Sequence, residues 1–417
     1  MAQDIKLEPI NTLYIIKVYE TPDGKLISGR LPEHLNGTHF GDHLTCFILY
    51  QYHHCHVTQP LLLDQLHELG VEISSGQLSR IITRGKKDFH HEKDRILTVG
   101  LEVSKYINVD DTGARHDGQN GYCTHIGNDW FSWFQSTASK SRINFLKLLT
   151  VGYSDYYLNV DAIAYMQSNN LPRYILDTLA GDLGNMFADA RQWNDYLAQN
   201  GILKPLHIKI ATEAALIGSF IEHGISDNLV IVSDDAGQFN ILLHALCWIH
   251  AERTIDKVIP FTDKVKADID DVKDQIWTLY EGLKQFKQNP RPKDKKRLEQ
   301  MFDAVFTTKT SCVMLNEALK RLYRNKSELL LVLDRPDIPL HNNTAERALR
   351  DYVKKRKISG STRSESGRSC RDTFASLKKT CRKLNVSFWH YLKDRIGKTD
   401  LVPDLSELIR QQALNPG

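Results

Sequence analysis

The sequence predicts an α/β protein, in which a sheet-containing core is interrupted by helices and preceded by a helical region. A short β-rich run at 106–109 is followed by two further runs, 122–126 and 130–134, which form a hairpin across a Gly-Asn-Asp turn. A fourth, strongly apolar run at 229–232 follows a helical stretch at 211–222. Three strands, a helix and another strand follow the order of an α/β sheet, so we assign these segments to one core.

The remaining segments have mostly helical patterns. Residues 251–332 are charged, with apolar side chains at helical spacing and few strand signals, and we interpret them as a helical insertion. Further helices are expected at 141–150, 162–167, 343–357 and 368–384. These assignments divide the chain into an N-terminal region 1–100, a first core part 101–250, an insertion 251–335, a second core part 336–395 and a C-terminal tail 396–417.

A helix-turn-helix is expected at 58–84. Leucines recur there at helical spacing, Gly70 ends the first helix, and the capping box at 74–77 opens the second. The second helix would display Gln77, Arg80 and Arg84 on one face. These residue types can contact base edges and phosphates in a major groove, although an ordinary helical hairpin would have the same pattern.

Composition excludes several classes of protein. No leader-like segment opens the chain and no stretch is apolar enough to span a membrane, so we expect an intracellular, soluble protein. Seven scattered cysteines without a CxxC pair indicate reduced thiols, and neither a disulfide framework nor a cysteine-rich zinc module.

Positive charge is concentrated in one tenth of the chain. The net charge is only +3, but residues 341–383 contain thirteen Lys and Arg against four acids. Such a segment suits a polyanion, because neutralising phosphates releases condensed counterions. A solvated helix face is the alternative interpretation of this charge.

Three acids are the candidate catalytic residues. Asp110 and Asp234 each lie where an apolar strand is expected to stop, and ligand sites in open α/β sheets form at such ends. Glu346 lies in the first turn of the basic helix. Neighbouring side chains on a strand point to opposite faces, so either member of the pairs with Asp111 and Asp235 could belong to the site. Taken singly, each acid is more typical of a structural role: Asp110 of a turn, Asp234 of a helix cap and Glu346 of an i,i+4 ion pair with Arg350.

Together the acids indicate metal-dependent phosphodiester chemistry. Carboxylate oxygens suit Mg²⁺ or Mn²⁺, and two such ions about 4 Å apart stabilise the attacking and leaving oxygens of an in-line displacement. The basic side chains around Glu346 would hold the DNA backbone, and those we select are Arg347, Arg350, Lys354, Lys357 and Arg363.

Three sequence blocks resemble the bacterial transposases of the insertion-sequence-66 type, a DDE family. The blocks are Val109–Arg115, Val232–Arg253 and His341–Arg350, the last followed by Arg-Lys, a Gly-Ser loop and a helix that ends in an aromatic segment. The third block, with its Asn-Asn-x-Ala-Glu-Arg-Ala-x-Arg string, is the most specific. The resemblance covers about residues 105–393.

The resemblance implies a ribonuclease-H-like core in which Asp110, Asp234 and Glu346 hold two Mg²⁺ or Mn²⁺ ions. It implies cleavage by metal-activated water and attack of the freed 3′-hydroxyl on target DNA. The implied partners are terminal inverted repeats, target DNA, further copies of the chain and accessory proteins of the element, in the bacterial cytoplasm at the nucleoid and not at a membrane.

The resemblance also suggests roles for residues near the site. It places Cys247 and His250 just after the second acid, and we interpret His250 as a structural or near-site residue, since two ligands do not make a zinc site. Asn342 and Asn343 are expected mainly to cap the Glu346 helix.

The sequence departs from the family pattern at Asp111 and Asp235, where the family often has Glu and Gly, so a shift of one residue stays open at both acids. Many relatives have a zinc-binding segment and a coiled coil near the N-terminus, whereas this chain shows no CxxC pair there. Recognition of the transposon ends would then fall on 58–84. A metal-dependent nuclease and a catalytically silent DNA-binding regulator are the alternative functions.

Overall fold

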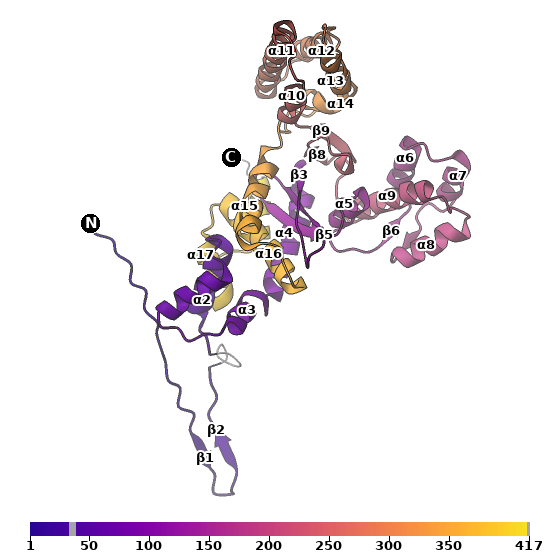
Figure 1. The fold of residues 1–417 in the computed structure, drawn as a ribbon. Coiled ribbons are helices and arrows are strands. Elements are labelled where there is room, and N and C mark those ends of the chain that lie inside the picture. Colours follow the sequence, from indigo (N-terminus) through magenta and orange to yellow (C-terminus); the bar gives the residue numbers. More distant parts are fainter. Residues whose placement is uncertain (33–38, 415–417) are drawn as a thin grey trace.

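The computed structural model describes residues 1–32 and 39–414, and its centre is a five-stranded sheet with helices packed around it (Figure 1). The strand order is β5-β4-β3-β8-β9. Strands β3, β4 and β5 are antiparallel neighbours, whereas β8 and β9 run parallel to β3. Their bounds are β3 Tyr106–Gly113, β4 Tyr122–Gly127, β5 Ser132–Thr137, β8 Val230–Ser233 and β9 Leu243–Leu246. The expected α/β class and hairpin are confirmed, and β9 was not predicted.

Helix α16 (Glu365–Lys383) covers the outer edge of the sheet. The backbone N–H groups of Ser132 and Phe134 in the edge strand β5 donate to the hydroxyls of Thr380 and Ser376 on α16, at 3.1 and 2.9 Å. Asp372 of the same helix accepts from the backbone N–H of Ser136 in β5 at 2.7 Å. An uncovered edge would leave these donors free to pair with another chain, so the polar face of α16 closes the sheet on this side.

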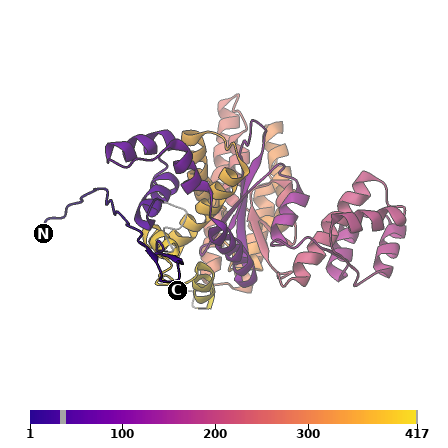
Figure 2. The ribbon, with the colours of Figure 1, turned by 90° about the horizontal axis from the view of Figure 1, so that it is seen from below.

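Two helical lobes extend from the sheet (Figures 1 and 2). The first lies between β5 and β8 and consists of α5 Arg142–Leu149, β6 Tyr156–Tyr157, α6 Val160–Ser168, α7 Arg173–Gly181, β7 Met186–Phe187, α8 Ala190–Gln199 and α9 Pro205–Glu222. The second follows β9 and consists of α10 Trp248–Asp256, α11 Asp263–Gln288, α12 Pro292–Phe306, α13 Val313–Arg324 and α14 Lys326–Leu329. The second lobe confirms the expected helical character of 251–335. The helices expected at 141–150, 162–167 and 211–222 all belong to the first lobe, which was not recognised as a unit.

The N-terminal region contains the two helices expected at 58–84. Its elements are β1 Val18–Glu20, β2 Leu26–Ser28, α1 Asp42–Leu49, a π-helical segment at Tyr50–His54, α2 Gln59–Glu68, α3 Ser75–Thr83 and α4 Lys87–Val103. The Ser74–Gln77 capping box is present, so the side chain of Gln77 is engaged at the start of α3. Arg84 lies beyond the helix in an extended conformation, which corrects the expected three-residue face: Arg80 is the exposed basic residue within α3.

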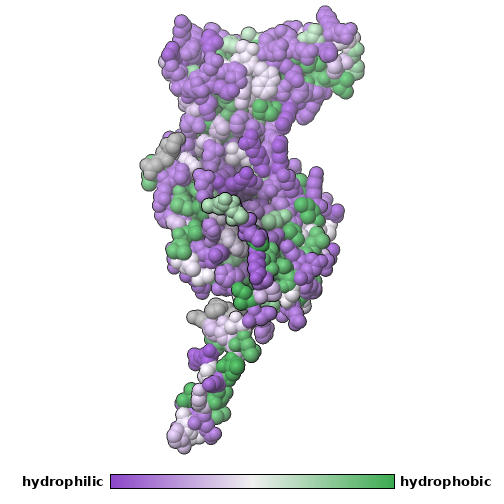
Figure 3. Space-filling model, turned by 90° about the vertical axis from the view of Figure 1, so that its left-hand side faces the viewer, coloured by the Kyte–Doolittle hydropathy of each residue, from purple (hydrophilic) through white to green (hydrophobic). Residues whose placement is uncertain are grey.

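Residues 1–32 form an arm that leaves the body of the molecule and carries the β1-β2 hairpin (Figure 1). Its apolar side chains are exposed, as the green surface of the arm shows in Figure 3. They include Ile5, Ile10, Leu13, Ile15, Val18, Tyr19 and Leu26. A lone two-stranded hairpin gains little stability by itself in water.

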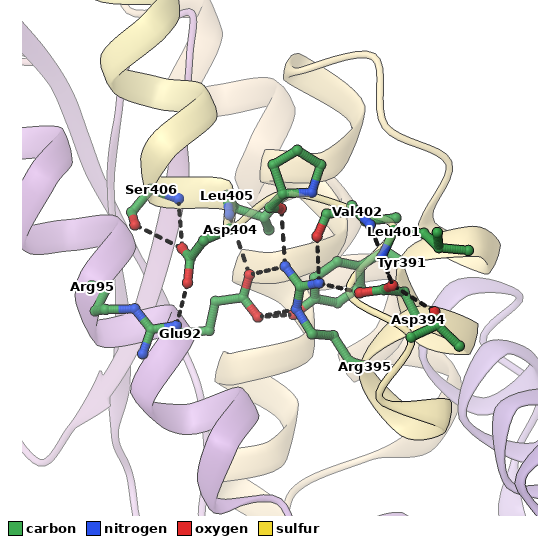
Figure 4. Close-up of polar contacts among 12 residues, drawn as sticks. Glu92, Arg95, Tyr391, Asp394, Arg395, Leu401, Val402, Asp404, Leu405 and Ser406 are labelled. Carbon is green, nitrogen blue, oxygen red and sulfur yellow. Dashed lines mark hydrogen bonds and ion pairs between the residues drawn. The ribbon is translucent and has the colours of Figure 1, made fainter.

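The segment expected to be a C-terminal tail contains a packed helix. Helix α18 (Leu405–Leu414) lies against α4 and follows α17 (Phe388–Gly397). Between them, the buried carboxylate of Glu92 on α4 accepts hydrogen bonds from Arg395 at 2.9 and 3.0 Å, from the Tyr391 hydroxyl at 2.7 Å and from the Leu405 backbone N–H at 3.3 Å (Figure 4). This network anchors the end of the described chain to α4.

Candidate active site

The strand register places Asp110 and Asp234 beside one another. Strands β3 and β8 are parallel, and their last paired residues are Asn108 and Val232. Two residues further along each strand are Asp110 and Asp234, at the point where the two strands separate. Adjacent strands lie about 4.8 Å apart, so the two acids leave the sheet as neighbours. They occupy the carboxyl ends of the parallel pair, where α/β sheets form ligand sites.

Strand β3 does not stop at Asp110, which corrects the expectation from the sequence. Its parallel pairing with β8 ends, but its antiparallel pairing with β4 continues to Gly113, with Asp110 opposite His125 and Asp111 opposite Thr124. The polar run after Val109 is therefore still strand. Asp234, in contrast, directly follows the last residue of β8.

The neighbouring acids Asp111 and Asp235 have partners of their own. Asp111 accepts a hydrogen bond from the Gln238 side chain at 2.7 Å. Asp235 is exposed, forms an ion pair with Arg321 and accepts from Asn325 at 3.4 Å, both on the second helical lobe. The hydrogen bonds that Asp110 and Asp234 accept are local, from the backbone N–H groups of Asp111 at 2.7 Å and Ala236 at 3.1 Å.

Glu346 is brought to these acids by the start of α15 (Asn343–Ser359). Asn342, fully buried just before the helix, donates to the Val109 carbonyl at 2.8 Å and accepts from the Asn108 amide at 2.9 Å. Because Val109 precedes Asp110, these two hydrogen bonds tie the beginning of α15 directly to the acid-bearing part of β3. Glu346 lies in the first turn, as expected.

The capping role expected of the two asparagines is wrong for Asn342. It occupies the N-cap position, but its side chain makes no capping hydrogen bond, because its amide is hydrogen-bonded to strand β3 instead. Asn343 is the first residue of the helix, and its side chain forms no hydrogen bond to the part of the chain that the structure describes.

The three acids interact electrostatically. Burial, and after it the negative charge of Asp234, raise the pKa of Asp110 to about 7, and Glu346 acts in the same direction. Burial also raises the pKa of Asp111, against the lowering effects of the Gln238 hydrogen bond and the Lys140 ammonium. Crowded carboxylates that disfavour one another's ionised forms are the electrostatic condition that a divalent cation relieves.

Glu346 has three basic neighbours in this arrangement, one histidine and two arginines. One carboxylate oxygen, Oε1, lies 3.6 Å from both His250 Nε2 and Arg253 Nη1, and the other, Oε2, lies 3.5 Å from Arg350 Nη2. Oε1 is buried and accepts no hydrogen bond from the described residues. Among residues 1–32 and 39–414, no group of three or more acidic, histidine or cysteine side chains is already gathered closely enough to hold a metal ion.

The donor set nevertheless fits a hard divalent cation. Carboxylate oxygens are the ligands that Mg²⁺ and Mn²⁺ prefer, and Glu346 Oε1 is a buried acceptor without a hydrogen bond. Asp110, Asp234 and Glu346 are the residues that would hold the ions.

Cys247 and His250 do not form a metal pair. The Cys247 sulfur is buried and accepts the backbone N–H of Asn342 at 3.2 Å, and burial raises the pKa of its thiol. His250 instead approaches Glu346. All seven cysteines are free thiols, as expected.

The basic residues selected on and after α15 are all exposed: Arg347, Arg350, Lys354, Lys357 and Arg363. Positions 346, 350, 354 and 357 are three or four residues apart, so these side chains follow Glu346 along one face of the helix. Of the five, only Arg350 forms an ion pair with a described residue. The other four cations remain available to an external anion.

Sequence reasoning missed Gln238, Arg253 and His125. Gln238 lies in a short 3-10 turn after β8 and gives no sequence signal. Arg253 belongs to the second sequence block and could have been selected through its spacing from His250 on α10. His125 is buried beside the site, opposite Asp110 on β4, and burial keeps its pKa well below the usual range.

Comparison with known proteins identifies the family of the chain. The sequence pattern of the Transposase IS66 family matches residues 217–369, which include Asp234 and Glu346. An uncharacterized protein of Sinorhizobium fredii, y4jO, is 44% identical over 304 residues, which is 72% of this chain and 95% of that protein. No helix within the described residues has the length and apolarity to cross a membrane. With this family pattern and a relative matched over nearly its whole length, the chain belongs to the Transposase IS66 family.

Proposed function

We propose that the chain cuts and joins DNA strands through two Mg²⁺ or Mn²⁺ ions held by Asp110, Asp234 and Glu346. The observation that carries this proposal is the register of β3 and β8, which makes Asp110 and Asp234 neighbours where the strands separate. The raised pKa of Asp110, which Asp234 and Glu346 help to cause, supports the same grouping of three acids. The separate partners of Asp111 and Asp235 favour Asp110 and Asp234 as the site acids.

The core would then be ribonuclease-H-like, with three antiparallel strands extended by two parallel ones. Helices α2 and α3 would form the helix-turn-helix that recognises the terminal inverted repeats, with Arg80 toward the DNA. The first lobe separates Asp110 from Asp234 in sequence, and the second lobe separates Asp234 from Glu346. The chemistry therefore depends on a fold that reunites distant segments, and further copies of the chain would bring paired ends together.

Each residue has a distinct role in this mechanism. When bound, the metal pair supplies an activated water for cleavage and stabilises the charge that develops on the phosphate oxygens. Asp110 presents its carboxylate from β3 and Asp234 from the residue after β8, while Asn342 holds the start of α15 so that Glu346 stays within reach. The exposed cations of α15 would hold the DNA backbone beside the acids.

The direct test combines the purified chain with Mg²⁺, DNA carrying the inverted repeats of its element, and a target plasmid. Joined products support the proposal, cuts without joining indicate a nuclease, and salt-sensitive binding without cleavage indicates a regulator. Asp110→Asn, Asp234→Asn and Glu346→Gln should each abolish cleavage while DNA binding persists. The matched control is Asp235→Asn, because Asp235 is adjacent in sequence but paired with Arg321. Full activity in any of the three variants would remove that residue from the site.

A further inference from the structure

A surface hollow of about 600 Å³ lies beyond the end of β3, beside the candidate active site. Its walls come from the loop between β3 and β4 with the first residue of β4, and from the last turns of α15 with the loop that follows. They include Arg115, Gly121, Tyr122, Arg356 and Ser361. The two loops are tied to each other: the backbone N–H of Asp117 donates to the Thr362 carbonyl at 2.8 Å, and the His116 ring bonds the Thr362 hydroxyl at 2.9 Å. The hollow is therefore a groove built by two joined segments.

The groove is connected to the acids. Arg356 Nη1 lies 3.4 Å from the Thr112 hydroxyl, two residues after Asp110 on β3. Lys140 Nζ lies 5.6 Å from the centre of the Tyr122 ring and is close enough to Asp111 to lower its pKa. At about 3.3 Å per strand residue, the entrance at Gly113 is roughly 10 Å from Asp110. That is about three nucleotides of a stacked DNA strand.

The lining has the chemistry of a single-strand site. Arg115 of the lining and Lys140, which lies beside the Tyr122 ring, are exposed, and neither forms an ion pair with a described residue. The half-buried ring of Tyr122 is an aromatic surface of the kind on which unpaired bases stack. Gly121 allows the two sides of the β3–β4 loop to approach closely, because a Cβ atom at this position would lie 2.7 Å from the Ala114 carbonyl oxygen. The residues that line the groove include no acid, and Glu365, which follows in the chain, is paired with Arg368.

We propose that this groove binds an unpaired segment of a DNA strand about three nucleotides from the scissile phosphate, with Arg115 and Arg356 on the backbone and Tyr122 against a base. The proposal rests on the proposed function, since it takes the reacting DNA to lie at Asp110. Arg356 lies on the same helix as the cations that follow Glu346, so α15 carries basic side chains both near the acids and at the groove.

The test uses fluorescence anisotropy in EDTA, so that binding is measured without cleavage. The probes are a labelled blunt duplex and the same duplex with a five-nucleotide single-stranded tail. The unchanged protein should bind the tailed duplex about tenfold more tightly, and Arg115→Ala and Tyr122→Leu should each remove most of that preference while changing blunt-duplex affinity less than about twofold. The control Lys296→Ala alters an exposed lysine of α12 and should change neither affinity.

Ser361→Glu provides a second way to test the groove, because Ser361 is exposed and the added acid would repel the tail without disturbing the core. Equal binding of the two probes by the unchanged protein, or equal losses on both probes in the variants, would overturn the proposal. If the protein binds the tailed duplex more tightly through these residues but cleaves no DNA in Mg²⁺, the groove proposal is supported and the proposed function is refuted.

Discussion

Replacing Asp110 by asparagine should stabilise the protein, and the gain should grow with pH. The pKa of Asp110 is raised in the folded protein from 3.8 to about 7, so the folded state holds the proton more tightly than the unfolded chain does. The contribution of Asp110 to stability is therefore fully present below about pH 4 and is lost as pH rises toward 7. Asparagine has no charge to bury, and its side-chain oxygen can still accept the Asp111 backbone N–H.

The size of the effect follows from the shift in pKa. At about 1.4 kcal/mol per unit, a rise of roughly three units corresponds to about 4 kcal/mol across the whole titration. About 3 kcal/mol of this falls between pH 5 and pH 8. The free energy of unfolding of Asp110→Asn, relative to that of the unchanged protein, should therefore be about 3 kcal/mol higher at pH 8 than at pH 5.

Urea unfolding in EDTA at pH 5 and pH 8 measures this difference. Asp235→Asn is the control, since Asp235 is exposed and paired with Arg321, so this substitution removes a neighbouring carboxylate outside the crowded site. Adding Mg²⁺ at pH 8 should narrow the advantage of Asp110→Asn, because the cation binds only the unchanged folded protein tightly. A pH-independent difference, or a destabilised variant at pH 8, would refute the view that uncompensated carboxylates crowd this site.

Three other substitutions test the supports around the site. Arg395→Met leaves the buried Glu92 carboxylate without its ion pair and should cost about 3 to 5 kcal/mol of stability in urea unfolding, whereas an unchanged midpoint would argue against the network in Figure 4. Asn342→Ala leaves the Val109 carbonyl without its hydrogen bond, so we expect the free energy of unfolding to fall by about 1 to 3 kcal/mol and DNA cleavage to slow. Cleavage at the original rate would show that activity does not depend on this anchor of α15. Arg80→Ala should weaken duplex binding and lower the slope of log affinity against log salt by about 1, and an unchanged slope would remove Arg80 from the DNA contact.

The elements that carry the acids were accessible from sequence because their patterns are local. The apolar run before Asp234, the hairpin after Asp110 and the basic helix with Glu346 in its first turn all formed as expected. The sequence could not favour one aspartate of each adjacent pair as the site residue, because side-chain alternation along a strand says only that the two neighbours point to opposite faces. The preference depends on which residues each side chain contacts in the fold. Gln238 and Arg321, the partners of Asp111 and Asp235, come from segments that no local sequence pattern connects to these acids.

Three other features were predicted wrongly or missed, because they depend on contacts or lengths that a local sequence pattern does not reveal. Asn342 has the residue type and position of a helix cap, but tertiary contact with β3 takes its amide away from that role. Strand β9 has only four residues and runs directly into α10, so its pattern is too short to separate from the helix. Helix α18 was read as a tail because its anchor, Glu92, lies more than three hundred residues earlier in the chain.

The most direct test of the central claim is a Mn²⁺ titration followed by electron paramagnetic resonance, on the unchanged protein and on single variants. Asp110, Asp234 and Glu346 are expected to hold the ions, so Asp234→Asn and Glu346→Gln should each weaken Mn²⁺ binding at least about tenfold, while Asp235→Asn should leave it unchanged. Equal Mn²⁺ affinity in the unchanged protein and in both of the first two variants would contradict the claim that these acids form a divalent-cation site.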